Sequence, residues 1–166
     1  AITHPQRIQS LSLLCTVARG KDAVRMTPQM FWTTCRTTLG TKASRRRAFL
    51  ELIYPKRDLA NLDCAALAAE LEPLFGHDLA QQPPVAMRQA MALRKHDCTA
   101  ELSKLTNIRS LVVSAEEDPI APSRFGKQLA ALIPGARFIE MPGASHGAPI
   151  QHETRVNRHL TENFSN

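Results

Sequence analysis

The sequence predicts an α/β fold in which parallel strands alternate with helices, and three observations carry this prediction. Strand, helix, strand and helix patterns follow one another between residues 108 and 163. An isolated apolar run lies near the N-terminus, and a long helical segment separates it from the other strands. Alternation of this kind is typical of a parallel sheet covered by helices. The long segment between the strands indicates a helical insertion.

The first strand is predicted at residues 8–16, where apolar residues first alternate and then run continuously, as in a largely buried strand. From residue 21 to residue 95 the apolar spacing becomes helical. We expect several short helices there and no strands, including helices near residues 61–71 and 84–96. Their apolar stripes indicate core packing rather than a cofactor site. Prolines are expected to separate these helices, at Pro28, Pro55, Pro73, Pro83 and Pro84.

The C-terminal elements are more sharply defined. Residues 108–115 form a β-branched run that predicts a strand, and an acidic turn follows it. A helix is predicted from Ser123 to Leu132, where Pro134-Gly135 then breaks the pattern. Residues 136–141 predict another strand, and residues 151–163 predict a closing amphipathic helix.

The two loops that follow these last strands hold the candidate site residues, Asp118 and His146. Loops at the carboxyl ends of neighbouring parallel strands lie together, so we expect these side chains to meet. A histidine base needs a carboxylate to fix its tautomer and to stabilise its protonated form. Taken singly, each residue has a simpler role in turn geometry, and Glu116 or Glu117 is an alternative acid.

The order of these residues resembles the C-terminal portion of the α/β-hydrolase superfamily. The motifs are Glu-Glu-Asp-Pro-Ile-Ala-Pro after one strand and Gly-Ala-Ser-His-Gly after the next, and residues 4–14 resemble the junction to the family's sixth strand. The resemblance implies that Asp118 is the acid and His146 the base of a catalytic triad. It also implies a core formed by residues 1–20 and 96–166, with residues 21–95 as a helical cap. From the residues alone, Met30, Phe31 and Trp32 are candidates for lining a pocket.

The sequence Gly143-Ala-Ser145-His146-Gly147 also satisfies the G-x-S-x-G pattern of a nucleophile elbow. Ser145 is a poor candidate nucleophile, because the family order is serine, acid, histidine and because no strand is predicted after it. The pattern does not recur, and the resemblance places the nucleophile and the oxyanion hole before the sixth strand. We therefore expect this chain to be a fragment, inactive alone, that requires a missing N-terminal segment or a complementary chain.

The function implied is hydrolysis of a small carboxylic ester or lactone by a Ser-His-Asp mechanism, with a small acyl compound as substrate. The alternative is a non-catalytic protein that holds a small ligand in the same pocket. Without the missing strands the sheet would expose an edge and an apolar face, which predicts poor stability or association, including a homo-oligomer.

Composition bears on other functions. The net charge of +6 invites a nucleic-acid interpretation. However, the one basic cluster is Arg45-Arg46-Arg47, and a single Trp and a single Tyr offer little surface for stacking on bases, so we expect no nucleic-acid partner. No apolar run reaches the ~20 residues that span a membrane, so we expect no membrane segment in this sequence. The sequence lacks a Cys-x-x-Cys pair and a glycine-rich phosphate loop, so we expect no metal and no cofactor. Free thiols in a reducing compartment predict a cytoplasmic protein.

Overall fold

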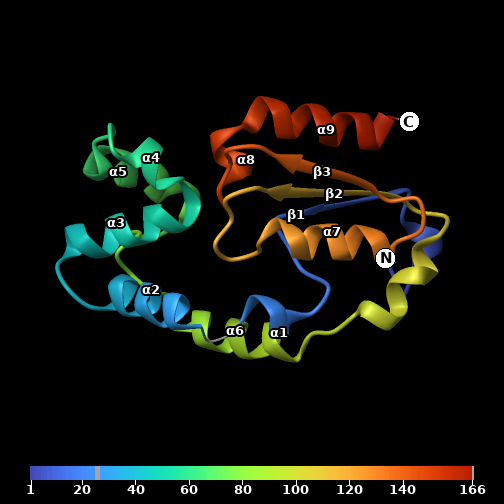
Figure 1. Cartoon of the computed structure of the whole chain (residues 1–166), viewed down its shortest axis with the longest axis horizontal. Coiled ribbons are helices and arrows are strands. Elements are labelled where there is room, and N and C mark those ends of the chain that lie inside the picture. The colour runs from blue at the N-terminus through green and yellow to red at the C-terminus, as the bar shows by residue number, and fades with distance from the viewer. Residues whose placement is uncertain (25–26, 166) are drawn as a thin grey trace.

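The computed structural model describes residues 1–24 and 27–165, and it shows a layered α/β unit beside a group of helices (Figure 1). The strands are β1 (Ser10–Leu14), β2 (Arg109–Ala115) and β3 (Arg137–Met141). The helices are α1 (Gly20–Ala23), α2 (Pro28–Thr38), α3 (Lys42–Ile53), α4 (Lys56–Leu59), α5 (Cys64–Phe75), α6 (Val85–Lys95), α7 (Ser123–Leu132), α8 (Ala148–Gln151) and α9 (Glu153–Ser165), with 3-10 turns η1 (Pro5–Arg7) and η2 (Thr99–Leu105).

The three strands form one parallel sheet in the order β1-β2-β3. The central strand β2 is buried from Ser110 to Ala115, as its β-branched sequence predicts for a strand covered on both faces. Every residue of β1, by contrast, is only half-buried. The sheet is therefore well covered at its centre and open along β1.

Helices cover both faces of the sheet (Figure 1). On one face, Val156 of α9 packs against Leu111 and Val113 of β2. On the other, Leu129 of α7 packs against Val112. Helix α7 approaches β2 closely because it carries glycine at position 126, where a Cβ atom would lie 1.8 Å from the Ser114 hydroxyl oxygen. Successive side chains of β2 thus supply the cores on opposite faces.

The helical segment, residues 21–95, begins and ends at the same point of the sheet unit. Arg19 and Asp97 form an antiparallel bridge. Beside it, the Gly20 amide donates to the His96 carbonyl at 2.9 Å. The segment has its own small core, which includes Leu50, Leu59, Leu71 and Leu79. Its described residues form helices and no strand, as predicted; residues 25 and 26 lie outside the described part.

The structure confirms the predicted α/β class and the order of its elements, with three local differences. The first strand is shorter than residues 8–16, and the closing helix predicted at residues 151–163 is α9, shifted by two residues and preceded by the short helix α8. The prediction that Pro73 separates helices was wrong, because it lies inside α5. A proline costs a helix one backbone hydrogen bond, and α5 continues only to Phe75 before Gly76 ends it in a left-handed conformation.

None of the helices in the described residues is long and apolar enough to cross a bilayer.

Candidate active site

Asp118 lies in the loop after β2, which we call the acid loop (residues 116–122). Its side chain is fully buried. One carboxylate oxygen, Oδ1, accepts hydrogen bonds from the backbone amides of Ile120 and Ala121 at 2.7 and 2.8 Å. The local turn therefore holds the carboxylate in one orientation and leaves its other oxygen available.

His146 lies in the loop after β3, which we call the histidine loop (residues 142–147). Its Nδ1 atom forms a 2.8 Å hydrogen bond with Oδ2 of Asp118, so the two predicted residues meet. The bond fixes Nδ1 as the protonated nitrogen when the ring is neutral. Nε2 then carries the free lone pair, on a side chain that is 31% exposed. This arrangement makes Nε2 a proton acceptor.

The alternative candidates from the sequence are engaged elsewhere. Ser145 is buried, and its hydroxyl donates to the Leu52 carbonyl at 3.3 Å and to the Glu117 carbonyl at 3.4 Å. The carboxylate of Glu116 accepts from the Gly143 amide at 2.8 Å, and that of Glu117 pairs with Arg57. The structure thus brings Asp118, and neither glutamate, to the His146 ring.

Two residues beside this site were not found by sequence reasoning. Cys15, directly after β1, has a backbone φ of +46°, and its amide donates to the Val113 carbonyl at 2.8 Å. Burial, with a smaller effect of the Asp118 charge, raises the pKa of its thiol to about 12. Arg57, at the start of α4, contacts both loops. A lone cysteine and a surface arginine carry no periodic signal, so their place depends on the tertiary fold.

Two cavities adjoin the acid loop. One, of about 580 Å³, lies between the loop and α1–α2, and Met30 and Asp118 are among its lining residues. The other, of about 350 Å³, lies between the loop and α2–α4, and Trp32, Tyr54 and Ser145 are among its lining residues. Phe31, the third candidate pocket residue of α2, is 61% exposed. The helical segment therefore contributes walls to both spaces next to the acid.

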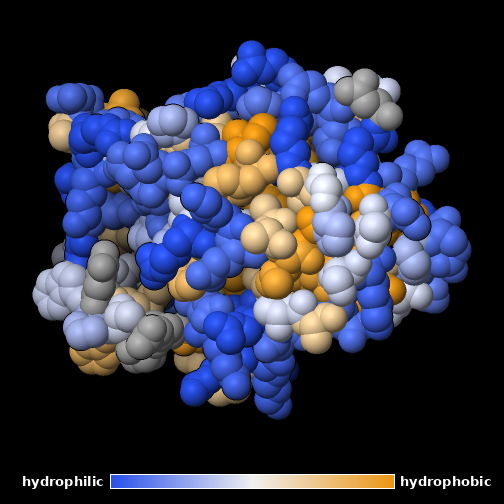
Figure 2. Space-filling model, turned by 45° about the vertical axis from the view of Figure 1, so that its right-hand side comes forward, coloured by the Kyte–Doolittle hydropathy of each residue, from blue (hydrophilic) through white to orange (hydrophobic). Residues whose placement is uncertain are grey.

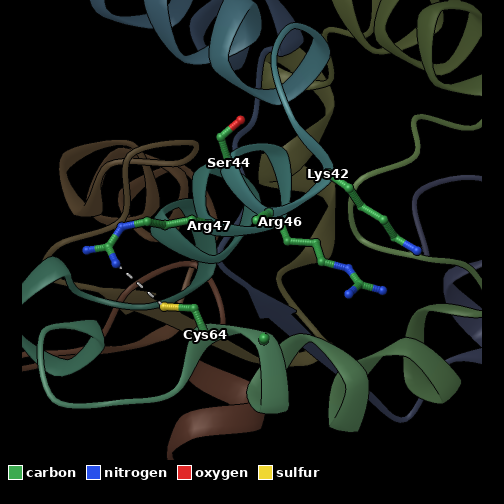
Figure 3. A pocket seen from close by; sticks show the side chains of 7 residues that line it. Lys42, Ser44, Arg46, Arg47 and Cys64 are labelled. Carbon is green, nitrogen blue, oxygen red and sulfur yellow. Dashed lines mark hydrogen bonds between the residues drawn. The ribbon is translucent and has the colours of Figure 1, made fainter.

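A separate hollow of about 520 Å³ lies on the helical segment, between α3 and α5 (Figure 3). Its cationic side chains already have acidic partners: Lys42 and Arg46 pair with Asp78 at 2.6 and 2.8 Å, and Arg47 pairs with Glu51 at 3.4 Å. Two members of the basic cluster, Arg46 and Arg47, are thus paired with carboxylates. In residues 1–24 and 27–165, moreover, no group of three His, Cys, Asp or Glu side chains is placed to hold a metal ion.

The fold is that of the α/β-hydrolases. The chain superimposes on an α/β-hydrolase from a Medee basin deep-sea metagenome with a TM-score of 0.74 and 19% identity, covering 99% of this chain and 59% of that one. For the enol-lactonase from Burkholderia xenovorans LB400 the TM-score is 0.73 at 22% identity, with 100% and 60% covered. For a thermophilic esterase from Thermogutta terrifontis it is 0.64 at 21% identity, with 96% and 56% covered.

The family follows from the sequence itself. Residues 72–166, more than half of the chain, match the model of the TAP-like protein family, and the chain belongs to that family. The chain spans about three fifths of the length of the solved structures it matches. It corresponds to the C-terminal portion of an α/β-hydrolase, as its sequence predicts.

Proposed function

We propose that this chain is the acid–base part of an α/β-hydrolase that hydrolyses a small carboxylic ester or lactone. The observation that carries the proposal is the 2.8 Å hydrogen bond between His146 Nδ1 and the buried Asp118 carboxylate. The fold likeness to an enol-lactonase and an esterase supports the choice of acyl substrates. Fold alone does not define a substrate, so the site geometry has the greater weight.

In this proposal a serine supplied by an N-terminal segment attacks the carbonyl carbon, and His146 Nε2 takes the hydroxyl proton. Asp118 stabilises the imidazolium, which then protonates the leaving oxygen; a water molecule repeats the sequence and releases the acid. The oxyanion hole also comes from the N-terminal segment. Within this chain the last carbonyls of α3 accept hydrogen bonds from the histidine loop. In this proposal the negative end of that helix favours the imidazolium that forms on His146 during the reaction.

We also propose that residues 21–95 act as a cap that shapes the acyl pocket. The bridge between Arg19 and Asp97 supports an insertion that leaves and rejoins the core at one point. The cavities of about 580 and 350 Å³ support a substrate space between this segment and the acid loop. The core of the enzyme would then be residues 1–20 and 96–166, completed by the N-terminal segment.

The open edge of β1 is the proposed docking site for that segment. An apolar groove of about 320 Å³ lies beside β1, and Leu11, Leu13 and Leu102 are among its lining residues. Figure 2 likewise shows apolar surface among the polar side chains of one face. A parallel strand from the N-terminal segment would pair with the edge backbone groups of β1. A second copy of this chain is the competing occupant of that edge.

The four free cysteines suit a reducing compartment, and we propose that the protein is cytoplasmic.

The test is turnover of short-chain p-nitrophenyl esters by the complete gene product and by this 166-residue chain. Activity is expected in the complete product only. His146→Ala should lower kcat at least about a thousandfold, because the base that activates the nucleophile is lost. Ser145→Ala, by contrast, should retain most activity.

Three results would count against the proposal. Turnover by the chain alone that is lost in Ser145→Ala would make the Gly143–Gly147 motif the nucleophile elbow. Full activity of His146→Ala would remove the base from its proposed role. Binding of an ester without turnover by the complete product would favour a ligand-binding protein.

A further inference from the structure

The helical segment contacts both loops of the candidate site through one short stretch, residues 52–57, which we call the α3–α4 turn. The Leu52 and Ile53 carbonyls accept hydrogen bonds from the Ser145 hydroxyl at 3.3 Å and from the Gly147 amide at 3.0 Å. A Cβ atom on Gly147 would lie 2.4 Å from the Ile53 carbonyl oxygen. The end of α3 is therefore in direct backbone contact with the residues on either side of His146.

Arg57 adds a side-chain connection from the same turn. One guanidinium nitrogen, Nη1, pairs with the carboxylate of Glu117, and the other, Nη2, donates to the Gly143 carbonyl at 2.8 Å. Glu117 directly precedes Asp118, and Gly143 lies three residues before His146. The two arms of one side chain thus contact the acid loop and the histidine loop at the same time.

A second bond between the loops completes this arrangement. The Gly143 amide donates to the Glu116 carboxylate at 2.8 Å, so Gly143 is held by both its amide and its carbonyl. The Arg57 side chain is 56% exposed, and exposed ion pairs contribute little to global stability. Its guanidinium fork, however, fixes two acceptors at a set separation, which a lysine ammonium group cannot do.

We propose that Arg57 is a positioning residue that couples the docking of the helical segment to the alignment of Asp118 and His146. It touches no reacting atom and acts through the two loops. When the segment is docked, Arg57 holds the loops in register for the Nδ1–Oδ2 bond; when the segment moves away, that constraint is released. The inference rests on the proposed function, because alignment matters to turnover only if the pair acts on a substrate.

The kinetic test uses ester hydrolysis by the complete gene product with Arg57→Ala, Arg57→Lys, Glu117→Gln and the double variant. We expect kcat to fall about tenfold in Arg57→Ala with KM changed less than twofold, the size of one hydrogen bond lost from the aligned state. Arg57→Lys should recover only part of the loss. The double variant with Glu117→Gln should be no slower than Arg57→Ala, because the two groups act as one unit.

The matched control is Arg47→Ala, since Arg47 is an exposed arginine of α3 whose partners, Glu51 and Cys64, lie within the helical segment. It should retain the kinetics of the unchanged protein. Wild-type kcat in Arg57→Ala, or an equal loss in Arg47→Ala, would overturn the inference. If His146→Ala is inactive in the same assay, the proposed function survives that result and only the role of Arg57 fails.

A second measurement needs no substrate. We expect the Nδ1 proton that His146 shares with Asp118 to give a downfield NMR signal in the complete gene product. This signal should broaden or shift in Arg57→Ala and remain in place in Arg47→Ala. An unchanged signal in Arg57→Ala would overturn the positioning role even if no ester is turned over.

Discussion

The sheet unit and the helical segment differ in how they treat their apolar side chains. In the sheet unit, Leu111, Val112 and Val113 of β2 are almost completely buried under α7 and α9. Among the described residues, all but two of the exposed large apolar side chains lie in the helical segment; the exceptions are Leu132 and Phe164. The sheet unit therefore buries the side chains of its central strand under its own helices. The helical segment, in contrast, leaves several large apolar side chains exposed to solvent among the described residues.

In addition to its small apolar core, the helical segment is held together by charge pairs between its own residues. Asp78, a buried residue in the turn after α5, accepts two hydrogen bonds from the Arg46 guanidinium at 2.8 Å each and lies 2.6 Å from the Lys42 ammonium. Arg36 likewise donates to Glu51 at 2.5 and 3.1 Å, from α2 to α3. Charge pairs respond to pH and salt, while apolar packing does not respond directly. The two regions should therefore fail under different conditions.

The largest effect should come from a matched pair of core substitutions. Leu111 of β2 and Leu50 of α3 are both fully buried. Each change to alanine leaves a cavity that costs about 2–5 kcal/mol. Leu111→Ala should unfold the whole chain at lower urea, whereas Leu50→Ala should release the helical segment and leave β2 protected in hydrogen exchange. Loss of β2 protection in Leu50→Ala would mean that the two regions unfold as one unit.

An intermediate effect is expected at low pH. The Arg46 guanidinium and then the Lys42 ammonium hold the pKa of the Asp78 carboxyl well below its usual range. This group therefore contributes stability above its unfolded-state pKa, near 4, and loses that contribution as the pH falls toward its folded-state pKa. On acidification, the hydrogen-exchange protection factors of α3 and α5, each taken relative to the unfolded-chain rate at the same pH, should fall before those of β2 do.

Asp78→Asn should show this loosened helical segment already at pH 7. Glu101→Gln is the control, because Glu101 forms an exposed pair with Lys104 in η2, outside the helical segment. If exchange in α3 and α5 is equally slow in the Asp78 variant, charge does not fasten the segment.

The sequence was sufficient to predict the sheet class and the meeting of Asp118 with His146, because both follow from strand order: neighbouring parallel strands end at one edge. The contacts of the α3–α4 turn with the two loops were not predictable. They depend on where a helix end docks, and Arg57 lies in a polar stretch without periodicity. The continuation of α5 through Pro73 was missed for a related reason, since tertiary packing outweighs local propensity.

The smallest effect is expected at the carboxyl end of β1, on the alkaline side. The pKa of the Cys15 thiol is about 12 in the folded chain, against an ordinary value of 9.0. A raised pKa contributes stability that is complete below pH 9 and declines as the pH rises toward 12, because the unfolded chain then loses the proton first. Between pH 8 and pH 10.5 the loss from this group should be about 2 kcal/mol.

Urea unfolding of the unchanged chain and of Cys15→Ala at the two pH values measures this loss. Cys15→Ala should have a shallower decline with pH, while Cys35→Ala, which removes a thiol from the helical segment, should decline like the unchanged chain. Equal declines in all three proteins would show that ionisation of Cys15 does not limit the alkaline stability of the sheet unit. The contrast between the regions would then rest on acid lability alone.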